Sequence, residues 1–253
     1  MRIGIIGSGN VAGVLAKSLS AGGHTITYIC SRNKTTGLKL AQHLDADFFN
    51  DTEFITDNCE LTIIAIDDGS IQDVVKKLPA LKHGVVHTSG ATDLKALKKM
   101  PQHGVLYPVN SINSKQKKIT KGTYFCIEAT APGLTNSLRN IVKSMACTPV
   151  YMNSKNRFAV HVAAVFANNF VNSLYQASYD ILEKNNLSFD IIKPLLETTL
   201  NNALLNKPQL VQTGPAKRND QLTIKHHLAF LKKNPDLKNI YSQLNKLIIK
   251  QQD

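Results

Sequence analysis

The sequence predicts an α/β fold in which a doubly wound, mostly parallel sheet is followed by an all-α C-terminal domain. Up to about residue 152, short β-rich runs alternate with helical stretches, which is typical of βαβ units. Two of these runs, IGII and LTIIAI, are continuously apolar, as expected for strands that helices cover on both faces. Beyond this point the strand signal ends and long helical periods begin.

The individual elements follow from these patterns in chain order. We expect strands in IGIIG, TITYIC, LTIIAI, GVVHTSG, GVLYPV and TYFCIEA. The intervening helices are expected in NVAGVLAKSLSAG, TTGLKLAQHL, SIQDVVKKL and about residues 131–145. After the turn-prone stretch MNSKN, four helices are expected at about 156–182, 188–205, 219–233 and 236–250. The prediction is therefore two domains, residues 1–152 and 153–253.

Composition favours a soluble protein. The chain has 253 residues, 43% of them hydrophobic, and no apolar run reaches the roughly 18 residues of a membrane span. The N-terminus enters a predicted strand without the apolar segment and cleavage site of a secretory signal, so we expect a cytoplasmic protein without membrane contact. The four cysteines form no CxxC pair and have no His cluster near them in the sequence. We expect buried small hydrophobes and no metal site or disulfide.

The net charge of +12 raises the question of a nucleic-acid partner. Residues 1–150 carry 17 basic and 11 acidic side chains and residues 151–253 carry 13 and 7, so each part has an excess of +6. The densest basic run, KQKKITK, lacks the interleaved aromatic residues that stack on bases and reads as a solvated loop. We therefore expect no nucleic-acid partner, whereas attraction of small anions fits the charge.

A glycine-rich turn follows the first predicted strand. It matches G-x-G-x-x-A, in which the first Gly allows a tight turn, the second allows close approach to a pyrophosphate, and Ala allows the helix to pack on the strand. Placed before a helix, whose N-terminus attracts anions, the motif predicts the dinucleotide-binding turn of a Rossmann domain. The alternative is a purely structural turn. The predicted cofactor-binding residues are Gly7, Ser8, Gly9, Asn10, Val11 and Ala12.

The end of the second strand distinguishes NADP from NAD. NAD sites place a carboxylate there for the ribose 2′-hydroxyl, but this sequence offers Ser31, Arg32 and Asn33. A guanidinium pairs with a 2′-phosphate, which a carboxylate would repel. The sequence therefore predicts NADP as the cofactor, with an ordinary surface Arg as the alternative.

Further polar residues follow later strands. Asp67 and Asp68 could suggest metal or acid–base chemistry, but Ser70 resembles a helix N-cap and makes helix entry the preferred interpretation. His87 and Ser89 lie at the end of the fourth expected strand, GVVHTSG, where ligands of such sheets bind. They are candidates for lining the cleft, and ordering the loop is the alternative.

The first long helix carries polar residues on an apolar sequence. His161 and Asn168 are seven residues apart, which places them about 20° apart on a regular helix, and Asn172 falls on the same line. Buried polar groups need partners, so this line marks either a satisfied structural His or a catalytic one.

Several motifs together resemble a family. GIIGSGNVA, VVHTSGA, GVLYPVNS, HVAAVFANNF, TGPAKRND and TIKHHLAFL are similar to bacterial Rossmann-like proteins with a C-terminal domain of unknown function. This group resembles the NADP oxidoreductases related to deazaflavin-dependent reductases and to pyrroline-5-carboxylate reductase. The resemblance covers nearly the whole chain. It departs from the family's TGPxxRGD pattern at Asn219, where the family has Gly; Asn tolerates a left-handed backbone better than most residues.

The resemblance implies an NADP-binding Rossmann domain, a helical domain like that of 6-phosphogluconate dehydrogenase and a homodimer formed through those helices. It brings no substrate.

From these residues we expect an NADP(H)-dependent oxidoreductase that transfers hydride to a small molecule in the cleft between the two domains. His161 is the candidate proton donor and Asn168 the group that polarises the acceptor. Lys217 and Arg218 are candidates for holding an anionic substrate or the cofactor phosphates. The alternative is a non-catalytic NADP-binding sensor or assembly protein, which has no need for His161.

Overall fold

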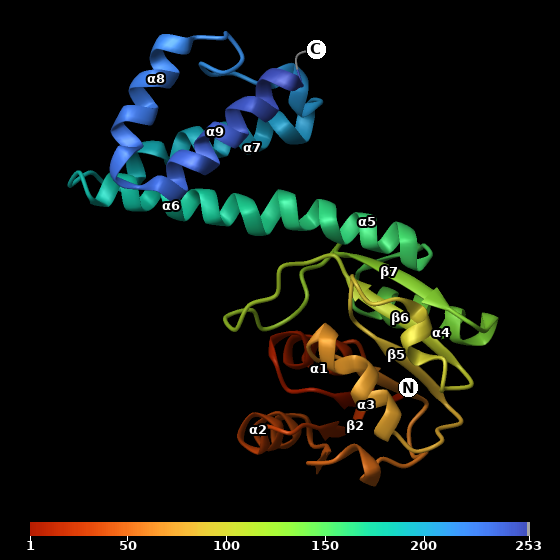
Figure 1. Cartoon of the computed structure of the whole chain (residues 1–253). Helices are drawn as coiled ribbons and strands as arrows, with labels where there is room; N and C mark the ends of the chain where they lie inside the picture. The colour runs from red at the N-terminus through yellow and green to blue at the C-terminus, as the bar shows by residue number, and fades with distance from the viewer. Residues whose placement is uncertain (252–253) are drawn as a thin grey trace. The chain divides into compact units, whose positions relative to one another are not determined.

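The protein is described by a computed structural model, which covers residues 1–251. The chain divides into two compact units, Met1–Asn169 and a second that begins at Phe170. The first holds the sheet and the helices that cover it, and the second is helical (Figure 1). No helix among residues 1–251 has the length and apolar character needed to cross a membrane.

The first unit is built on an eight-stranded sheet with the order β3-β2-β1-β4-β5-β6-β7-β8. Neighbouring strands are parallel except for β6 and β7, which are antiparallel. The first six strands follow the order that characterises doubly wound dinucleotide-binding sheets, and the direction of winding reverses between β1 and β4. The strands are β1 (Arg2–Ile6), β2 (Thr25–Cys30), β3 (Asp47–Phe49), β4 (Leu61–Ile64), β5 (Gly84–His87), β6 (His103–Pro108), β7 (Tyr124–Ala129) and β8 (Thr148–Tyr151).

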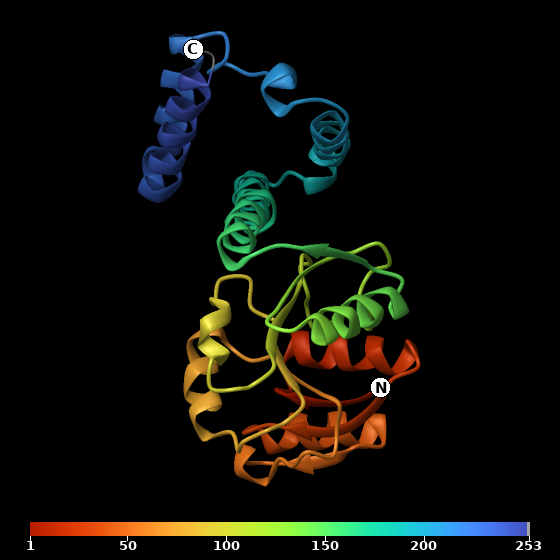
Figure 2. The ribbon, with the colours of Figure 1, turned by 90° about the vertical axis from the view of Figure 1, so that its right-hand side faces the viewer.

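Helices cover both faces of this sheet. One apolar cluster joins the sheet to α1, α2 and α4, and a second joins it to α3 and the turn η3. Figure 2 shows the red α1 and the green α4 on one side of the strands and the orange α3 on the other. Every residue of β4 and β5 is buried, as expected for strands covered on both faces. The helical elements are α1 (Asn10–Ala21), α2 (Lys34–Leu44), η1 (Thr52–Phe54), η2 (Asp68–Ser70), α3 (Ile71–Lys77), η3 (Leu94–Leu97), α4 (Pro132–Ser144) and α5 (Ser154–Ala164).

The second unit consists of helices joined by short turns. Its helical elements are α6 (Val171–Glu183), η5 (Phe189–Ile192), α7 (Lys193–Leu205), η6 (Pro208–Val211), α8 (Gln221–Phe230), η7 (Leu231–Lys233) and α9 (Pro235–Lys250). Among its described residues only Ala216 and Ile224 are buried, and large apolar side chains such as Leu204 and Leu205 are 73% and 82% exposed. The π-helix η4 (Val165–Phe170) connects α5 to α6 in one continuous helical stretch.

The predicted fold class is confirmed: a mostly parallel, doubly wound sheet precedes a helical region. Strands β3 and β8 were not predicted from the sequence. The π-helix η4 in the middle of the first long helix was not predicted either, and it changes the relation between His161 and Asn168.

Candidate functional site

The turn after β1 requires glycine at its first position. Gly7 has φ +125°, and a Cβ there would lie 2.1 Å from the carbonyl oxygen of Ala65. Its N–H donates to the carbonyl of Cys30 at 2.8 Å, which joins the turn to the end of β2. The tight turn expected at Gly7 is therefore a requirement of the backbone.

Gly9 opens the N-terminus of α1. It occupies the N-cap position, where no side chain accepts a hydrogen bond from the helix, and the first turn of α1 carries no acidic residue. A Cβ at Gly9 would meet no atom within 4 Å. The free N–H groups of this helix end, with the positive end of its dipole, are thus accessible to an anion. Next to Gly9, Asn10 is exposed and Val11 half-buried, and Ala12 is buried against the core.

Ser8 connects the glycine turn to the loop after β2. Its hydroxyl lies 2.7 Å from the Ser31 hydroxyl and 2.6 Å from that of Thr36. Asn33 accepts a hydrogen bond from the Thr36 N–H and thereby caps α2. Arg32 lies between these ordered residues, is exposed, and has no hydrogen bond or ion pair with the described chain. The loop therefore presents a free guanidinium beside the turn.

The end of β5 is a buried polar corner. His87 is fully buried, and its Nδ1 accepts a hydrogen bond from the Ser89 N–H at 3.2 Å. Its Nε2 finds no hydrogen-bond partner within residues 1–251. Burial, followed by the nearby Arg157 guanidinium, lowers the pKa of His87 to about 4, so the ring is neutral at pH 7. The Ser89 hydroxyl accepts from the N–H groups of Ala91 and Thr92, so this residue orders the loop.

A buried arginine fastens α5 to the sheet. Arg157 is 1% exposed, pairs with Glu128 of β7 and donates to the carbonyl of Thr92. The Ser154 hydroxyl donates to the same carboxylate at 2.8 Å and accepts from the Leu94 N–H at 3.0 Å. Buried charges need such pairing. These contacts fix the first turns of α5 against β7 and the loop that follows β5.

One turn further along α5, His161 reaches the carboxyl end of β6. Residues four apart lie on the same helix face, so the anchored Arg157 also directs His161 toward the sheet. Its Nδ1 lies 3.2 Å from the hydroxyl of Tyr107, and the two rings meet edge to face at 5.8 Å. A Cβ on Gly90 would lie 2.7 Å from His161 Nδ1 and 2.8 Å from the Tyr107 ring. Gly90 therefore leaves the space that this pair occupies.

The contact with Tyr107 decides which nitrogen of His161 is available to a substrate. Burial, and then the neighbouring Cys126 and Asp68, raise the pKa of Tyr107, so its hydroxyl keeps its proton at neutral pH. This hydroxyl can donate to His161 Nδ1 when the ring is neutral, which leaves Nε2 on the side available to a substrate. A histidine ring gives a proton to a substrate from its protonated form.

The predicted alignment of His161 with Asn168 was wrong. It assumed 3.6 residues per turn throughout, but Asn168 lies in η4, where backbone bonds close wider i→i+5 turns. Within the first unit His161 is half-buried against Tyr107, whereas Asn168 is exposed. The role of Asn168 toward an acceptor stays a prediction.

Lys217 and Arg218 lie in the second unit, in the turn before α8, and both are exposed. Gly214 and Asn219 adopt positive φ values of 104° and 53°, and Asp220 caps α8 by accepting from the Thr223 N–H at 3.0 Å. Asn219 thus supplies the left-handed turn that Gly would supply in the family pattern. Binding of an anion by the two basic residues stays a prediction.

Two other expectations concern Ser70 and metals. Ser70 occupies the N-cap position of α3, but its side chain makes no capping hydrogen bond. Its backbone already has helical angles, with φ −94° and ψ −10°, because the turn η2 leads into the helix, whereas a capping side chain needs an extended backbone. No group of His, Cys, Asp and Glu within residues 1–251 has an arrangement that could hold a metal ion.

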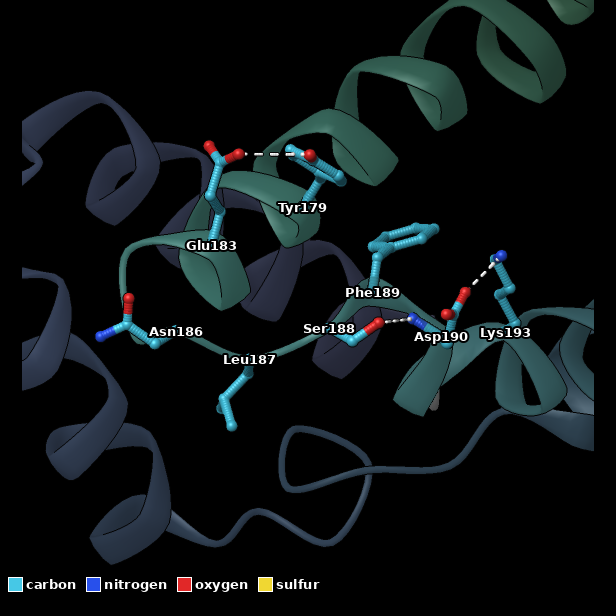
Figure 3. Close-up of a pocket in the computed structure, with 8 residues that line it drawn as sticks. All are labelled: Tyr179, Glu183, Asn186, Leu187, Ser188, Phe189, Asp190 and Lys193. Carbon is cyan, nitrogen blue, oxygen red and sulfur yellow. Dashed lines mark hydrogen bonds and ion pairs between the residues drawn. The ribbon is translucent and has the colours of Figure 1, made fainter.

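A surface hollow lies elsewhere. It has a volume of about 630 Å³ and lies where α6 meets η5, within the second unit. Figure 3 shows that its polar side chains pair with one another, Tyr179 with Glu183 and Asp190 with Lys193. None of the predicted site residues lines it. The glycine turn and the Tyr107–His161 pair are therefore the better candidate site.

Sequence reasoning missed Tyr107 and the two residues that anchor α5, Arg157 and Glu128. Tyr107 could have been found, because it stands near the carboxyl end of a predicted strand, where ligands of such sheets bind. Nothing in the sequence distinguishes Arg157 from the many exposed basic residues, since its burial depends on pairing with a strand 29 positions earlier.

The strand order, the Gly7 turn and the open end of α1 define a Rossmann dinucleotide-binding protein. Two family models match the chain: NADP oxidoreductase coenzyme F420-dependent over residues 2–89, and Domain of unknown function (DUF2520) over residues 123–248. A Bacteroides fragilis protein, provisionally described as an NADP oxidoreductase, is 30% identical over 98% of both chains, with a TM-score of 0.89. The chain therefore belongs to the family of NADP oxidoreductase-like proteins that join these two domains.

More distant solved structures share the fold. A pyrroline-5-carboxylate reductase from Streptococcus pyogenes is 15% identical, with 99% of this chain and 98% of that chain covered and a TM-score of 0.66. An imine reductase from Myxococcus stipitatus in complex with NADP⁺ is 16% identical, with coverages of 99% and 92% and a TM-score of 0.63. No curated protein matches the sequence significantly.

Proposed function

We propose that the protein is an NADP(H)-dependent oxidoreductase that transfers hydride between the nicotinamide and a small molecule. The observation that carries the proposal is the free guanidinium of Arg32 beside the uncapped end of α1. The backbone N–H groups at Gly9 suit a pyrophosphate, and the open space where a Cβ would stand leaves room for it. Within the described chain, neither the N–H groups at this helix end nor the Arg32 guanidinium has a hydrogen-bond acceptor.

NADP is preferred over NAD because of the charge at the end of β2. The loop supplies Ser31, Arg32 and Asn33 and no carboxylate that would repel a 2′-phosphate. A guanidinium can bind such a phosphate through two parallel hydrogen bonds. The structural relative that binds NADP⁺ is compatible with this choice, and the name of the N-terminal family model makes a deazaflavin the acceptor to test first.

The bound nicotinamide would supply or accept the hydride. With the pyrophosphate at β1, the other end of the dinucleotide has to extend past β4 and β5 toward β6, a distance of about 14 Å at the usual spacing of strands. The Tyr107–His161 pair lies at that end of the sheet. In the proposal the protonated ring of His161 gives the proton, and Tyr107 holds the ring in position. Asn168 would polarise the acceptor, and Lys217 and Arg218 would attract an anionic substrate.

We also propose that two copies of the chain pair through their helical units. The support is the small number of buried side chains among the described residues of the second unit, together with strongly exposed ones such as Leu205 and Leu210. Apolar surface of this kind on a helical unit calls for a partner, and a second copy is the partner always present. Sedimentation equilibrium should give twice the chain mass, and a monomer at micromolar concentration would refute the pairing.

Turnover with a panel of acceptors tests the catalytic proposal. NADPH oxidation would be followed with a keto acid, a cyclic imine and a deazaflavin, using wild type, His161→Ala and, as matched control, His43→Ala, an exposed histidine on α2. With an accepted substrate, His161→Ala should lower turnover by roughly 10²–10⁴-fold while NADPH binding is kept, and His43→Ala should match wild type. Binding of NADPH without hydride loss to any acceptor would favour the sensor instead.

A further inference from the structure

One of the four cysteines differs from the others in its surroundings. All four are free and buried. Burial raises the pKa of Cys30 to about 12 and also raises the pKa values of Cys126 and Cys147. Cys59 lies just before β4, at the amino end of the sheet and thus at the edge opposite the dinucleotide turn. His83 lies just before the neighbouring parallel strand β5, so the register brings the two side chains together.

Cys59, His83 and Asp57 form a chain of contacts. The Cys59 sulfur lies 3.4 Å from His83 Nε2, and His83 Nδ1 lies 2.8 Å from a carboxylate oxygen of Asp57. The second contact is a close approach of charges rather than a well-aligned hydrogen bond. The same Asp57 oxygen accepts from the Lys82 N–H at 2.9 Å, which fixes the carboxylate in front of the ring. Cys59 and His83 are 24 positions apart, so the sequence gives no sign of this contact.

Two hydroxyl groups complete the cluster. Thr62 of β4 lies 2.7 Å from His83 Nε2 and 3.6 Å from the Cys59 sulfur, and its other contact is the Tyr28 hydroxyl at 2.7 Å. Tyr28 is fully buried and its pKa is raised, first by burial and then by Cys59, so it stays protonated and can only add hydrogen-bond donation to the network. His83, Asp57 and Tyr28 are therefore the titratable groups that face the sulfur.

The electrostatics of this cluster favour an ionised sulfur. Burial alone would raise the pKa of Cys59, but the hydrogen bonds from His83 and Thr62 outweigh it and the pKa is lowered. Burial alone would likewise lower the pKa of His83, but Cys59 and Asp57 raise it. Burial is the largest single influence on Asp57 and raises its pKa, but the contacts with Lys82 and His83 together outweigh it, so the pKa is lowered. The carboxylate therefore stabilises the protonated ring. A thiolate paired with an imidazolium is the nucleophilic form of cysteine.

We propose that Cys59, His83 and Asp57 form a reactive thiol site for peroxides and other small electrophiles, separate from the nicotinamide site. With hydrogen peroxide, the thiolate sulfur attacks one oxygen, an S–O bond forms and the O–O bond breaks. The sulfur is oxidised to sulfenic acid, and the leaving hydroxide takes the proton of His83 and departs as water. With iodoacetamide, an S–C bond forms and iodide leaves.

The other cysteines provide an internal comparison. Cys59 is 5% exposed and Cys147 is 7% exposed, so a small reagent reaches them with similar difficulty. A difference in their rates then reports ionisation rather than access. A thiol of ordinary pKa is only about 3% ionised at pH 7. If the proposed ion pair holds Cys59 as the thiolate, Cys59 should react at least about tenfold faster than Cys147.

The experiment is pulsed alkylation of the folded full-length protein with limiting iodoacetamide between pH 5 and 9, read by peptide mass spectrometry. Cys59 should be labelled about tenfold faster than Cys147 at pH 7, and its rate should stop rising with pH while that of Cys147 still rises. Equal or slower labelling of Cys59 overturns the proposal. A parallel treatment with hydrogen peroxide and a sulfenic-acid trap should label Cys59 first, and labelling at another cysteine first also overturns it.

Variants of the carboxylate separate reactivity from packing. Asp57→Asn should move the midpoint of the Cys59 pH–rate curve upward, while Glu53→Gln, an exposed acid of the same loop, should leave it in place. Circular dichroism at each pH verifies that both variants are folded. If Asp57→Asn folds and leaves the midpoint unchanged, the carboxylate has no part in the site and the proposed triad is wrong.

Discussion

The strand β5 has a histidine at each end, and the two are oppositely tuned. His83, just before the strand, meets Cys59 and Asp57, which raise its pKa although burial opposes them. At the carboxyl end, burial and the Arg157 guanidinium lower the pKa of His87 to about 4. Four positions on one strand thus separate a ring that favours its charged form from one that excludes it. His87 is fully buried and His83 only partly buried, so both burial and the charge of the neighbours contribute to the difference.

The amino and carboxyl edges of the sheet also differ in whether their polar groups have partners within the protein. At the amino edge, polar groups satisfy one another in a closed cluster. At the carboxyl edge, the end of α1 and the side chain of Arg32 have no internal partner within the described chain. In the closed cluster the groups shift one another's pKa values, whereas the open edge is available to a ligand.

Loss of the α5 anchor should cost the most. Arg157→Met leaves the Glu128 carboxylate without its buried partner, which should lower the free energy of unfolding by about 3–5 kcal/mol. Urea unfolding measures this cost. The double variant Arg157→Met with Glu128→Leu should recover much of it, and a single variant as stable as wild type would show that the ion pair does not hold α5.

His87 should make the protein sensitive to acid. Its pKa is about 4 when folded and about 6.5 when unfolded, so the unfolded state binds more protons between these values. Its stabilising contribution is complete above pH 6.5 and falls by up to about 3 kcal/mol as pH drops to 4. His87→Asn keeps an acceptor for the Ser89 N–H but does not titrate. The free energy of unfolding, measured from denaturation curves between pH 6.5 and 4, should therefore fall less in the variant than in wild type. Equal falls would show that His87 does not cause the acid sensitivity.

Two glycines of the same turn should respond differently. Gly7→Ala places a Cβ against the Ala65 carbonyl at positive φ and should cost roughly 2–4 kcal/mol by thermal unfolding. A Cβ at position 9 would contact no atom within 4 Å, so Gly9→Ala should lower the free energy of unfolding by only about 0.5–1 kcal/mol. Gly9→Ala should nevertheless lose most of the stabilisation by added NADPH, because its methyl group occupies the space left for the pyrophosphate. A normal NADPH response in this variant would place the cofactor elsewhere.

Most strands and helices and the position of the glycine turn could be predicted from the sequence, but the contacts between distant residues could not. Periodicity located the strands and helices, and the G-x-G-x-x-A spacing located the turn, because both signals are local in the chain. The short edge strand β3 and the Pro-containing β8 gave no such signal. The pairs Tyr107–His161, Arg157–Glu128 and Cys59–His83 join residues 24 to 54 positions apart. Only the packing of strands and helices brings them together.

The most direct test of the central claim is calorimetric titration of wild type and Arg32→Ala with NADPH and NADH. Wild type should bind NADPH at least about tenfold more tightly than NADH, because the guanidinium pairs with the 2′-phosphate. Arg32→Ala should weaken NADPH binding by about 10- to 100-fold and leave NADH nearly unchanged. Lys143→Ala, which removes an exposed charge on α4, should behave as wild type. Tighter binding of NADH by wild type, or unchanged NADPH binding by Arg32→Ala, would contradict the account.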